Sequence, residues 1–485
     1  MGRPPVSKKL PYGCCEIISF ESAEHLPRRR LGPPALTATS RLAPPQYADI
    51  NTEGFEYPAC VFDDQETCSE LVRNSPEPPH PSITDLVALL NSFQDIPVNP
   101  SLGQSQLLPE ALADPRVFYA FHHPFMIGHS FSDSFRQAIM MILESSNGMV
   151  LDAYTMALAL WDGQNQRMKP FRELDLSQGS HWLKWLQSPA VIRSDDAIAV
   201  IMLGQILVVY HIAVLGTSAH SILRRSLLLV KDWYPSLLNE PSLYPITITP
   251  IFIDTVECLV KREIPVIRPP PDDNTDYSIV DRSAGVCVGL LHLQYEVCKI
   301  GHLSKTLAPI THGNSFESTT DQDIRTYAKS LEDIKRRVSE WEPRPSTCFY
   351  TRYTQAEVSA MMMQARVYRL ATLLVIHRLQ FPLGVEDEPA ARLAMAIASE
   401  LECFTQWVPE EMRGVSIRFP LFVAMLEIDH VSDRVIRYVS PITSEPTYIN
   451  QLGTFLRLAK AARNSGFRGL WFDIAEDKLS MPVLA

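Results

Sequence analysis

A chain of 485 residues can form one large domain or two to three ordinary ones, and its 46% hydrophobic content is typical of a protein with a substantial core. The formal net charge of −11 argues against a protein that coats nucleic acid, so any DNA contact requires a local basic patch. Nine scattered cysteines, an odd number without any C-x-x-C pair, favour reduced thiols in the cytosol or nucleus over disulfides or a paired zinc site. The first residues, MGRPPVSKKLPYG, lack the apolar segment of a signal peptide.

Residues 1–80 differ from the rest of the chain in composition. The first 100 residues hold 15 of the 38 prolines, and such sequence buries too little apolar surface to offset chain entropy, so we predict a disordered N-terminal arm. Its first 42 residues carry seven Lys or Arg against three Glu, whereas residues 43–80 carry eight Asp or Glu against one Arg. Aromatic side chains interleave with this acidic half, which leaves two interpretations open: a disordered activation segment or an acidic linker.

A helical pattern begins near residue 82, and we place the second domain at residues 81–485. In SITDLVALLNSF, Ser82 is a plausible N-cap with Asp85 three residues later. Apolar residues at three- and four-residue spacing then predict helices in FSDSFRQAIMMILESS, MVLDAYTMALALWDG, SQGSHWLKWLQ and HSILRRSLLLVKDWY. The segment YPITITPIFIDTVECLV is rich in β-branched residues and proline, and it is typical of either a short extended piece or a helix over 252–260.

Residues 197–216 form a run of twenty residues without a formal charge, which is long enough to cross a membrane. A buried helix of a large all-α domain has the same pattern, and we favour it because we find no second such run in the sequence.

A break is predicted near 264–280, where three consecutive prolines precede acidic and polar residues, and a loop near 305–322. The remaining sequence predicts five helices, over 321–341, 354–381, 388–408, 418–440 and 446–464. Because alternating strands are nearly absent, the predicted class is all-α: a large multi-helix domain behind a disordered, Pro-rich arm.

The stretch FHHPFMIGHSFSDSF, residues 121–135, contains three histidines and a Gly-His-Ser sequence. A hydrolase nucleophile turn requires G-x-S-x-G after a strand, but here Ser132 occupies the last glycine position and a helix begins instead. We therefore predict a loop that enters a helix, with Ser130 or Ser132 as its cap.

No catalytic, cofactor-binding or metal-binding residues are predicted. His122, His123 and His129 lack metal-ligand spacing, and neither H-E-x-x-H nor a phosphate-binding glycine loop occurs. His211 and His377 lie in strongly apolar segments and are interpreted as hydrogen-bonded core histidines.

Basic residues of the arm are the candidates for nucleic-acid contact or nuclear import. GRPP with Arg3, Lys8 and Lys9 is similar to the core of a minor-groove-binding AT-hook, although so short a sequence arises easily by chance. PRRR, with Arg28, Arg29 and Arg30, is either an import signal or a solvated basic turn.

Three C-terminal stretches resemble the closing helices of the fungal-specific transcription factor domain: ARVYRLATLLVIHRLQF at 365–381, RFPLFVAMLEIDHVSDRVIRYV at 418–439 and GLWFDIAED at 469–477. The matching features are the Phe419-Pro420-Leu421 step, Arg434 near the end of its helix, and Trp471. The apolar helix around residues 199–230 resembles the long central helix of such domains, so the resemblance covers roughly residues 85–480.

The resemblance implies a nuclear, non-enzymatic regulator of RNA polymerase II transcription, with the transcription machinery or another transcription factor as partner. Control of a specific pathway, such as a secondary-metabolite gene cluster, is a further expectation, and a homodimer is compatible with the class. In this fold Pro420 is expected in the first turn of a helix. The arginines Arg366, Arg369 and Arg378 are expected in exposed or interface ion pairs, and Trp407 and Trp471 as packing anchors.

The sequence departs from the family at its N-terminus. A binuclear zinc cluster needs two C-x2-C-x6-C repeats to hold two Zn²⁺ ions, and Cys14, Cys15, Cys60 and Cys68 have the wrong spacing. Zinc is therefore expected only if a zinc-cluster exon is missing. Otherwise the chain is a co-regulator or scaffold that binds another transcription factor without contacting DNA itself. A third hypothesis, an all-α enzyme, would require a deep pocket with convergent pKa-shifted groups.

Overall fold

The structure is a computed structural model that divides the chain into two units, Met1–Pro76 and Glu77–Ala485. All residues that it describes belong to the second unit. They are residues 112–145, 148–162, 167–168, 173–186, 193–215, 219–269, 279–307, 321–407, 414–428, 431, 435–436, 445–467, 469–470 and 472–474. The predicted arm, the helix after Ser82, and the boundary between residues 80 and 81 lie outside this set and stay predictions.

The first half of the described unit is helical and agrees closely with the apolar spacing of the sequence. Its elements are α3 (Pro115–His122), η1 (His123–Phe125), η2 (His129–Phe131), α4 (Ser132–Ser145), α5 (Gly148–Leu160), α6 (Glu173–Leu186), α7 (Ser194–Leu215), α8 (His220–Val230), α9 (Tyr234–Leu237), η3 (Pro241–Leu243) and α10 (Tyr244–Lys261). The predicted helix over 220–234 ends earlier, at Val230, and α3 has no counterpart among the predictions.

The second half begins after the predicted break and contains the remaining helices. They are η5 (Val286–Leu290), α11 (Leu291–Leu307), α13 (Asp321–Glu340), α14 (Phe349–Arg352), α15 (Gln355–Gln380), α16 (Asp387–Trp407), α17 (Arg418–Met425) and α19 (Glu445–Asn464). The helix predicted over 418–440 is wrong in length, because α17 ends at Met425. Pro420 lies in its first turn as expected, where the missing N–H costs little.

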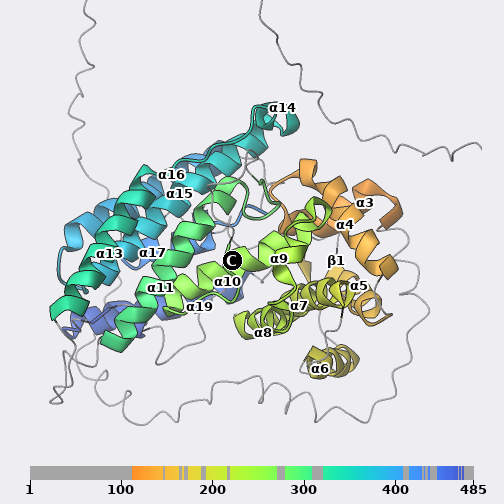
Figure 1. Cartoon of the computed structure of the whole chain (residues 1–485), viewed down its shortest axis with the longest axis horizontal. Helices are drawn as coiled ribbons and strands as arrows, with labels where there is room; N and C mark the ends of the chain where they lie inside the picture. The colour runs from red at the N-terminus through yellow and green to blue at the C-terminus, as the bar shows by residue number, and fades with distance from the viewer. Residues whose placement is uncertain are drawn as a thin grey trace, which may run out of the picture. The chain divides into compact units, whose positions relative to one another are not determined.

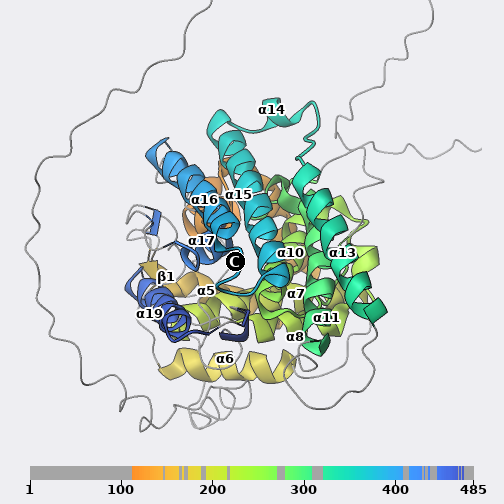
Figure 2. The same ribbon diagram turned by 90° about the vertical axis from the view of Figure 1, so that its left-hand side faces the viewer.

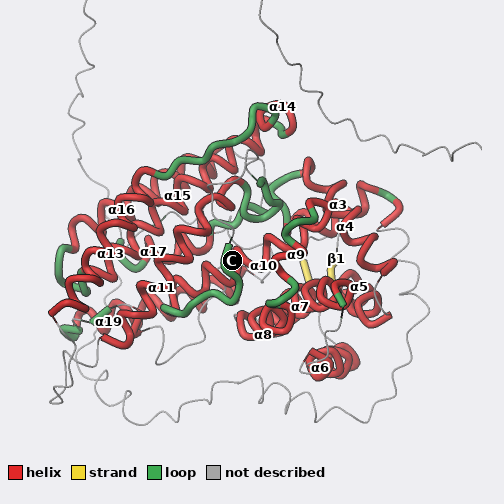
Figure 3. The backbone as a smooth tube through the Cα atoms, in the orientation of Figure 1, coloured by secondary structure: helices red, strands yellow, loops and turns green. Residues whose placement is uncertain are grey.

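Strands are nearly absent from the described residues, as the sequence predicts. β1 (Trp161–Asp162) pairs antiparallel with β2 (Arg167–Met168), and an isolated bridge joins Asp281 to Gly285. Figure 3 shows the short strands beside the helices, which make up most of the described backbone. The all-α class is confirmed.

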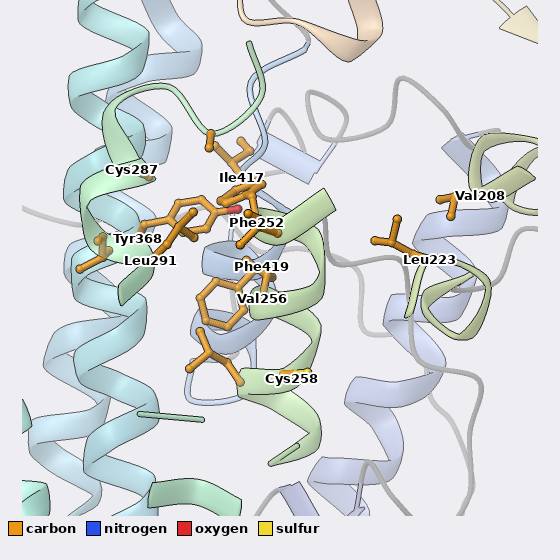
Figure 4. Packing of buried hydrophobic residues seen from close by; sticks show 14 of the residues in the cluster. Val208, Leu223, Phe252, Val256, Cys258, Cys287, Leu291, Tyr368, Ile417 and Phe419 are labelled. Atoms are coloured by element: carbon orange, nitrogen blue, oxygen red, sulfur yellow. The ribbon is translucent and has the colours of Figure 1, made fainter. Parts of the chain in front are cut away.

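Helix α10 lies at the centre of the unit. It contacts α4, α7 and α8 on one side and α11 on the other, so it joins the N-terminal helices to the helices that follow the break (Figure 1). On the far side of α11, helices α13, α15, α16 and α17 pack against one another, and Figure 2 shows α15 and α16 adjacent along their length. The core is one continuous cluster of buried apolar side chains. In Figure 4, Phe252 of α10 contacts Tyr368 of α15, which in turn contacts Phe419 of α17, with ring centroids 5.3 and 5.7 Å apart.

Helix α10 also settles the ambiguous segment at 244–260, which is helical throughout despite its prolines. Pro245 stands in the first turn, but Pro250 is inside the helix, where it lacks the N–H that would bond to the carbonyl of Ile246. Gln205 of α7 compensates, because its Nε2 donates to that carbonyl at 3.0 Å. A side chain from a neighbouring helix thus allows the proline to stay in the helix interior.

The apolar run at 197–216 forms α7, and most of its described side chains are buried in the core, as we favoured. The statement that no second such run exists is wrong. Among the described residues, two helices are long and apolar enough to cross a membrane, Ser194–Ile212 and Pro241–Lys261, and 67% and 78% of their apolar windows are buried within the structure. The second escaped notice because its prolines suggested an extended segment.

The C-terminal helices are joined by a buried ion-pair network. Arg378 of α15 is fully buried, and its guanidinium donates to Glu427 at 2.7 and 2.6 Å and to Asp387 at 2.7 Å. Arg463 of α19 also donates to Asp387, at 2.6 Å. Charge-assisted bonds of this kind fix the relative positions of α15, α16 and α19, because any displacement would leave a buried charge unpaired.

Candidate ligand-binding site

A cavity of about 190 Å³ lies between the N-terminal helices and α10. Its apolar walls come from helices α3, α4, α5, α7, α8 and α10, from η1 and from one C-terminal loop: Phe121, Pro124, Phe125, Phe135, Ile139, Ala157, Leu158, Met202, Ile206, Val208, Val209, Ile212, Leu223, Ile246, Phe252, Ile253 and Val415. All three of Val208, Leu223 and Phe252 line the cavity, and Figure 4 shows Val208 and Leu223 on one side of it and Phe252 on the other. Polar groups reach the same space from His122, Tyr154, Gln205, Thr249, Arg282, Ser283, Ser416 and Arg418.

Arg282 is the most constrained of the polar lining residues. It is 6% exposed and lies over the Phe135 ring, with the guanidinium carbon 4.1 Å from the ring centroid. Its Nε donates to the carbonyl of Pro245 at 2.7 Å, Nη1 donates to the carbonyl of Phe125, and Nη2 donates to Oε1 of Gln205 at 3.2 Å. Burial lowers the pKa of Arg282 to about 10, and the nearby Asp281 charge opposes this shift.

The cavity carries positive charge only. Arg282 and Arg418 are the charged residues of the lining, and the described lining contains neither Asp nor Glu. Asp281 precedes Arg282 in sequence, but its buried carboxylate accepts hydrogen bonds from the backbone of Ser283 and Ala284, each at 2.9 Å. Asp281 therefore organises its own turn, and the described residues place no carboxylate within ion-pair distance of Arg282.

His122 and Tyr154 form a neutral hydrogen-bonded pair in the cavity wall. Nδ1 of His122 lies 2.7 Å from the carbonyl of Phe118, so Nδ1 must carry the proton and donate, and Nε2 must accept from the Tyr154 hydroxyl at 2.8 Å. Burial lowers the pKa of His122 to about 4, opposed by the Phe118 hydrogen bond and assisted by the Arg282 charge. Burial also raises the pKa of Tyr154, so both groups are uncharged near neutral pH.

Two loops of the cavity are held by Gln364 of α15. Its Nε2 donates to the carbonyl of Ser283 at 2.8 Å and to that of Ser416 at 3.2 Å. Gly285 adopts φ +54°, and a Cβ there would lie 2.8 Å from Oε1 of the same Gln364 side chain. This turn therefore needs glycine for both its backbone conformation and its close approach to α15.

The Gly-His-Ser sequence is structural rather than catalytic. Ser130 donates through its backbone N at 2.8 Å and its hydroxyl at 2.7 Å to the carboxylate of Glu357, which also completes a capping box with Thr354 at the start of α15. The predicted cap function of Ser130 or Ser132 is wrong. Ser130 bonds to a distant helix, and the Ser132 hydroxyl makes no hydrogen bond within the described residues.

The other histidines considered in the sequence analysis are exposed, half-buried or packed against the backbone of neighbouring residues. His123 is buried with Nδ1 3.1 Å from the carbonyl of Ala120, and His129 is exposed. His377 is buried, with Nε2 2.8 Å from the carbonyl of Glu386, as expected of a core histidine. His211 is half-buried, so the prediction that it lies in the core is only partly correct.

A buried cluster of His220, Asp254 and Cys258 places three metal-ligand atoms within 4.8 Å of one another. Its surroundings favour a hydrogen-bonded network over a metal ion. Nη1 of Arg224 lies 3.1 Å from the Cys258 sulfur, and Nζ of Lys261 lies 3.1 Å from Nδ1 of His220. These two positively charged side chains lie next to the cluster, where they would repel a metal ion.

The chemistry of the two acidic groups agrees with this interpretation. Asp254 accepts from His220 at 2.8 Å and from the backbone N of Val266 at 2.7 Å, so both of its oxygens are used. Burial and the Asp254 charge raise the pKa of Cys258, which keeps it a thiol in these surroundings. No cysteine spacing in the sequence would have revealed this cluster, because its members come together only through the packing of α8 on α10.

The remaining residues singled out in the sequence have mixed outcomes. Arg378 forms the buried network, Arg366 pairs with Glu400 at 2.9 Å on the surface, and Arg369 donates to the carbonyl of Trp341 at 3.0 Å instead of forming an ion pair. The arm candidates Arg3, Lys8, Lys9, Arg28, Arg29 and Arg30 lie outside the described residues, as do Arg434, Trp471 and the side chain of Trp407.

The cavity residues themselves were not predicted from the sequence. Gln205 offered a signal, because a single amide inside an otherwise apolar run needs a hydrogen-bonding partner. Arg282 and Arg418 gave none, since each reaches the cavity only through the tertiary fold.

The described residues thus form an all-α protein with a cavity between its helices. Among them we find no cluster of catalytic groups. The family model described as the fungal specific transcription factor domain matches residues 206–435, from the middle of α7 to beyond α17. Residues 206–435 are therefore similar to the fungal specific transcription factor domain, and this similarity indicates a regulator of transcription. Comparisons with curated proteins and with solved structures gave no match.

Proposed function

We propose that the chain is a nuclear regulator of RNA polymerase II transcription that controls a specific set of genes. The observation that carries this proposal is the family match over residues 206–435, which covers the central helix α10 together with α8 and α11, two of the helices packed on it. A secondary-metabolite gene cluster is the target class that we propose, because regulators with this type of domain often act there.

The N-terminal arm supplies the transport and activation functions in this proposal. Arg28, Arg29 and Arg30 form the strongest basic sequence of the arm, and the acidic, aromatic residues 43–80 supply an activation segment. Replacing the three arginines by alanine in a fluorescently tagged chain is expected to shift it from nucleus to cytoplasm. Unchanged nuclear fluorescence would remove the import function from these residues.

Deletion of the gene, followed by complementation, tests the regulatory function directly. We expect a defined group of transcripts to change in the deletion strain and to return when the full chain is restored. A complementing chain that lacks residues 1–80 separates the arm from the helical domain. If no transcript group responds under any inducing condition, the proposed function is wrong.

A co-regulator that binds another transcription factor is the second candidate, and the formal net charge of −11 is the observation that favours it. Binding-site selection with the purified chain distinguishes the two. Sequence-specific, salt-sensitive DNA binding favours a direct regulator, whereas none, together with capture of a defined DNA-binding protein from nuclear extract, favours a co-regulator. Size-exclusion chromatography with light scattering tests the proposed homodimer.

A further inference from the structure

The cavity has the size and walls of a small-molecule site. About 190 Å³ exceeds the roughly 150 Å³ of an apolar protein cavity that accommodates benzene. Because side chains from α4, α5, α7, α8 and α10 line it, a molecule with one ring and a short substituent would be enclosed by apolar surface.

The charge of the lining restricts the chemistry of such a molecule. Arg282 holds its positive charge 6% exposed and satisfies it only with neutral acceptors: two carbonyls, the Gln205 amide and the Ser283 hydroxyl. Four of its five N–H groups are used, and the second hydrogen of Nη2 has no acceptor among the described residues. A buried cation without an ion-pair partner is costly, and an entering anion would offset this cost.

Arg418 strengthens this preference, because a second guanidinium lines the same space. Neither His122 nor Tyr154 opposes it, since the hydrogen bond between them keeps both groups uncharged. With no carboxylate in the described lining, both charged side chains of the cavity wall attract an anionic ligand, while Asp281, outside the lining, opposes them.

We propose that this cavity binds a small amphipathic acid, a molecule with an apolar ring or short chain and one carboxylate, and that Arg282 receives the carboxylate. The site joins the α4–α8 side of the unit to α10 and to the loops at residues 283 and 416, so its occupancy stabilises their contact. As a means of controlling transcription, this inference rests on the proposed function, but the binding itself does not depend on it.

A purely structural role for Arg282 is the competing interpretation, because its hydrogen bonds also tie η1 to the start of α10. Calorimetric titration of the purified full chain with 3-phenylpropanoate and with its neutral amide, 3-phenylpropanamide, separates the two interpretations. The probes have nearly the same size and apolar surface, and they differ in charge. We expect the acid to bind about tenfold to a hundredfold more tightly, the range of a hydrogen bond to a charged group.

Three variants locate the site. R282Q is expected to abolish the preference for the acid while the amide still binds, and A157F, which fills the cavity from α5, is expected to abolish binding of both probes. R366Q is the matched control, since it removes an arginine whose partner, Glu400, lies outside the cavity, and it is expected to bind both probes like the unmodified chain. Thermal denaturation of each variant verifies folding.

Equal affinity for acid and amide, binding of neither, or binding that A157F leaves intact would each overturn the proposal. If R282Q does not fold, the comparison of the two probes on the unmodified chain still decides it. The proposed function is tested by a separate experiment, the deletion of the gene. Binding with the expected preference, in a protein whose deletion changes no transcripts, would support the site and reject the regulator.

Discussion

His122 offers a test of the cavity wall that needs no ligand. Its ring is 5% exposed and held neutral between the Phe118 carbonyl and the Tyr154 hydroxyl, so protonation in the folded protein would break the bond that Nε2 accepts. The pKa is accordingly lowered from 6.5 to about 4, mainly by burial. Replacing this residue in H122Q removes the titrating group from both the folded and the unfolded chain.

The sign and size of the effect follow from proton linkage. Between pH 6.5 and about 4 the unfolded chain binds one proton at His122 and the folded chain binds none, so the folded state loses stability as the pH falls through this window. The loss is about 1.4 kcal/mol per pH unit, or about 2 kcal/mol between pH 8 and pH 5. Above pH 6.5 both states are neutral and the residue contributes no pH dependence.

Urea denaturation of the unmodified chain and of H122Q at several pH values between 5 and 8 measures this. We expect the free energy of unfolding of H122Q to fall less steeply below pH 6.5, by about one proton, whatever the absolute stability of the variant. H129Q is the control, because it makes the same replacement at an exposed histidine of the same stretch. Parallel curves for H122Q and the unmodified chain would refute a neutral, buried His122.

Three further substitutions test the contacts that hold the helices together, each by chemical denaturation. R378M should destabilise the protein by about 3–5 kcal/mol, because it removes the guanidinium that bonds to both oxygens of the buried Glu427 carboxylate and leaves only the more distant Arg463 within the described residues, and adding E427Q should recover part of the loss; an unchanged single variant would contradict the network. R366Q should change stability by less than about 0.5 kcal/mol, since its ion pair is exposed, and a larger loss would show that exposure alone misjudges it. G128A should cost about 1–3 kcal/mol, because a Cβ would lie 2.3 Å from Oε1 of Glu357 and displace the carboxylate that Ser130 contacts; no loss would mean that this carboxylate moves freely.

The positions of most helices could be predicted because apolar spacing is a local property. The stretch at 131–146 predicts α4 almost to the residue, and the uncharged run at 197–216 predicts α7. Helix α10 could not be settled in the same way, since Pro250 is tolerated only through a hydrogen bond from Gln205 on another helix. The end of α17 was also missed, because the apolar pattern continues beyond Met425 although the helix does not.

The cavity could not be predicted from the sequence for a related reason. Its charge depends on where Asp281 points, and that carboxylate turns toward the backbone of its own loop instead of toward the adjacent Arg282. In the sequence the two residues are neighbours of opposite charge, which gives no sign of where either side chain points. Only the fold separates them and leaves the arginine facing an apolar space.

The family match begins at residue 206, in the middle of α7, whereas the cavity has walls on both sides of that point. Phe121, Phe135 and Tyr154 precede the matched stretch, and Phe252 and Arg282 lie within it. A chain shortened to residues 206–435 would therefore lose one wall of the cavity and open the rest to solvent. The same division lets the shape of the cavity diverge between proteins that share the matched helices, because substitutions in the earlier wall remodel it without touching the part by which the family is recognised.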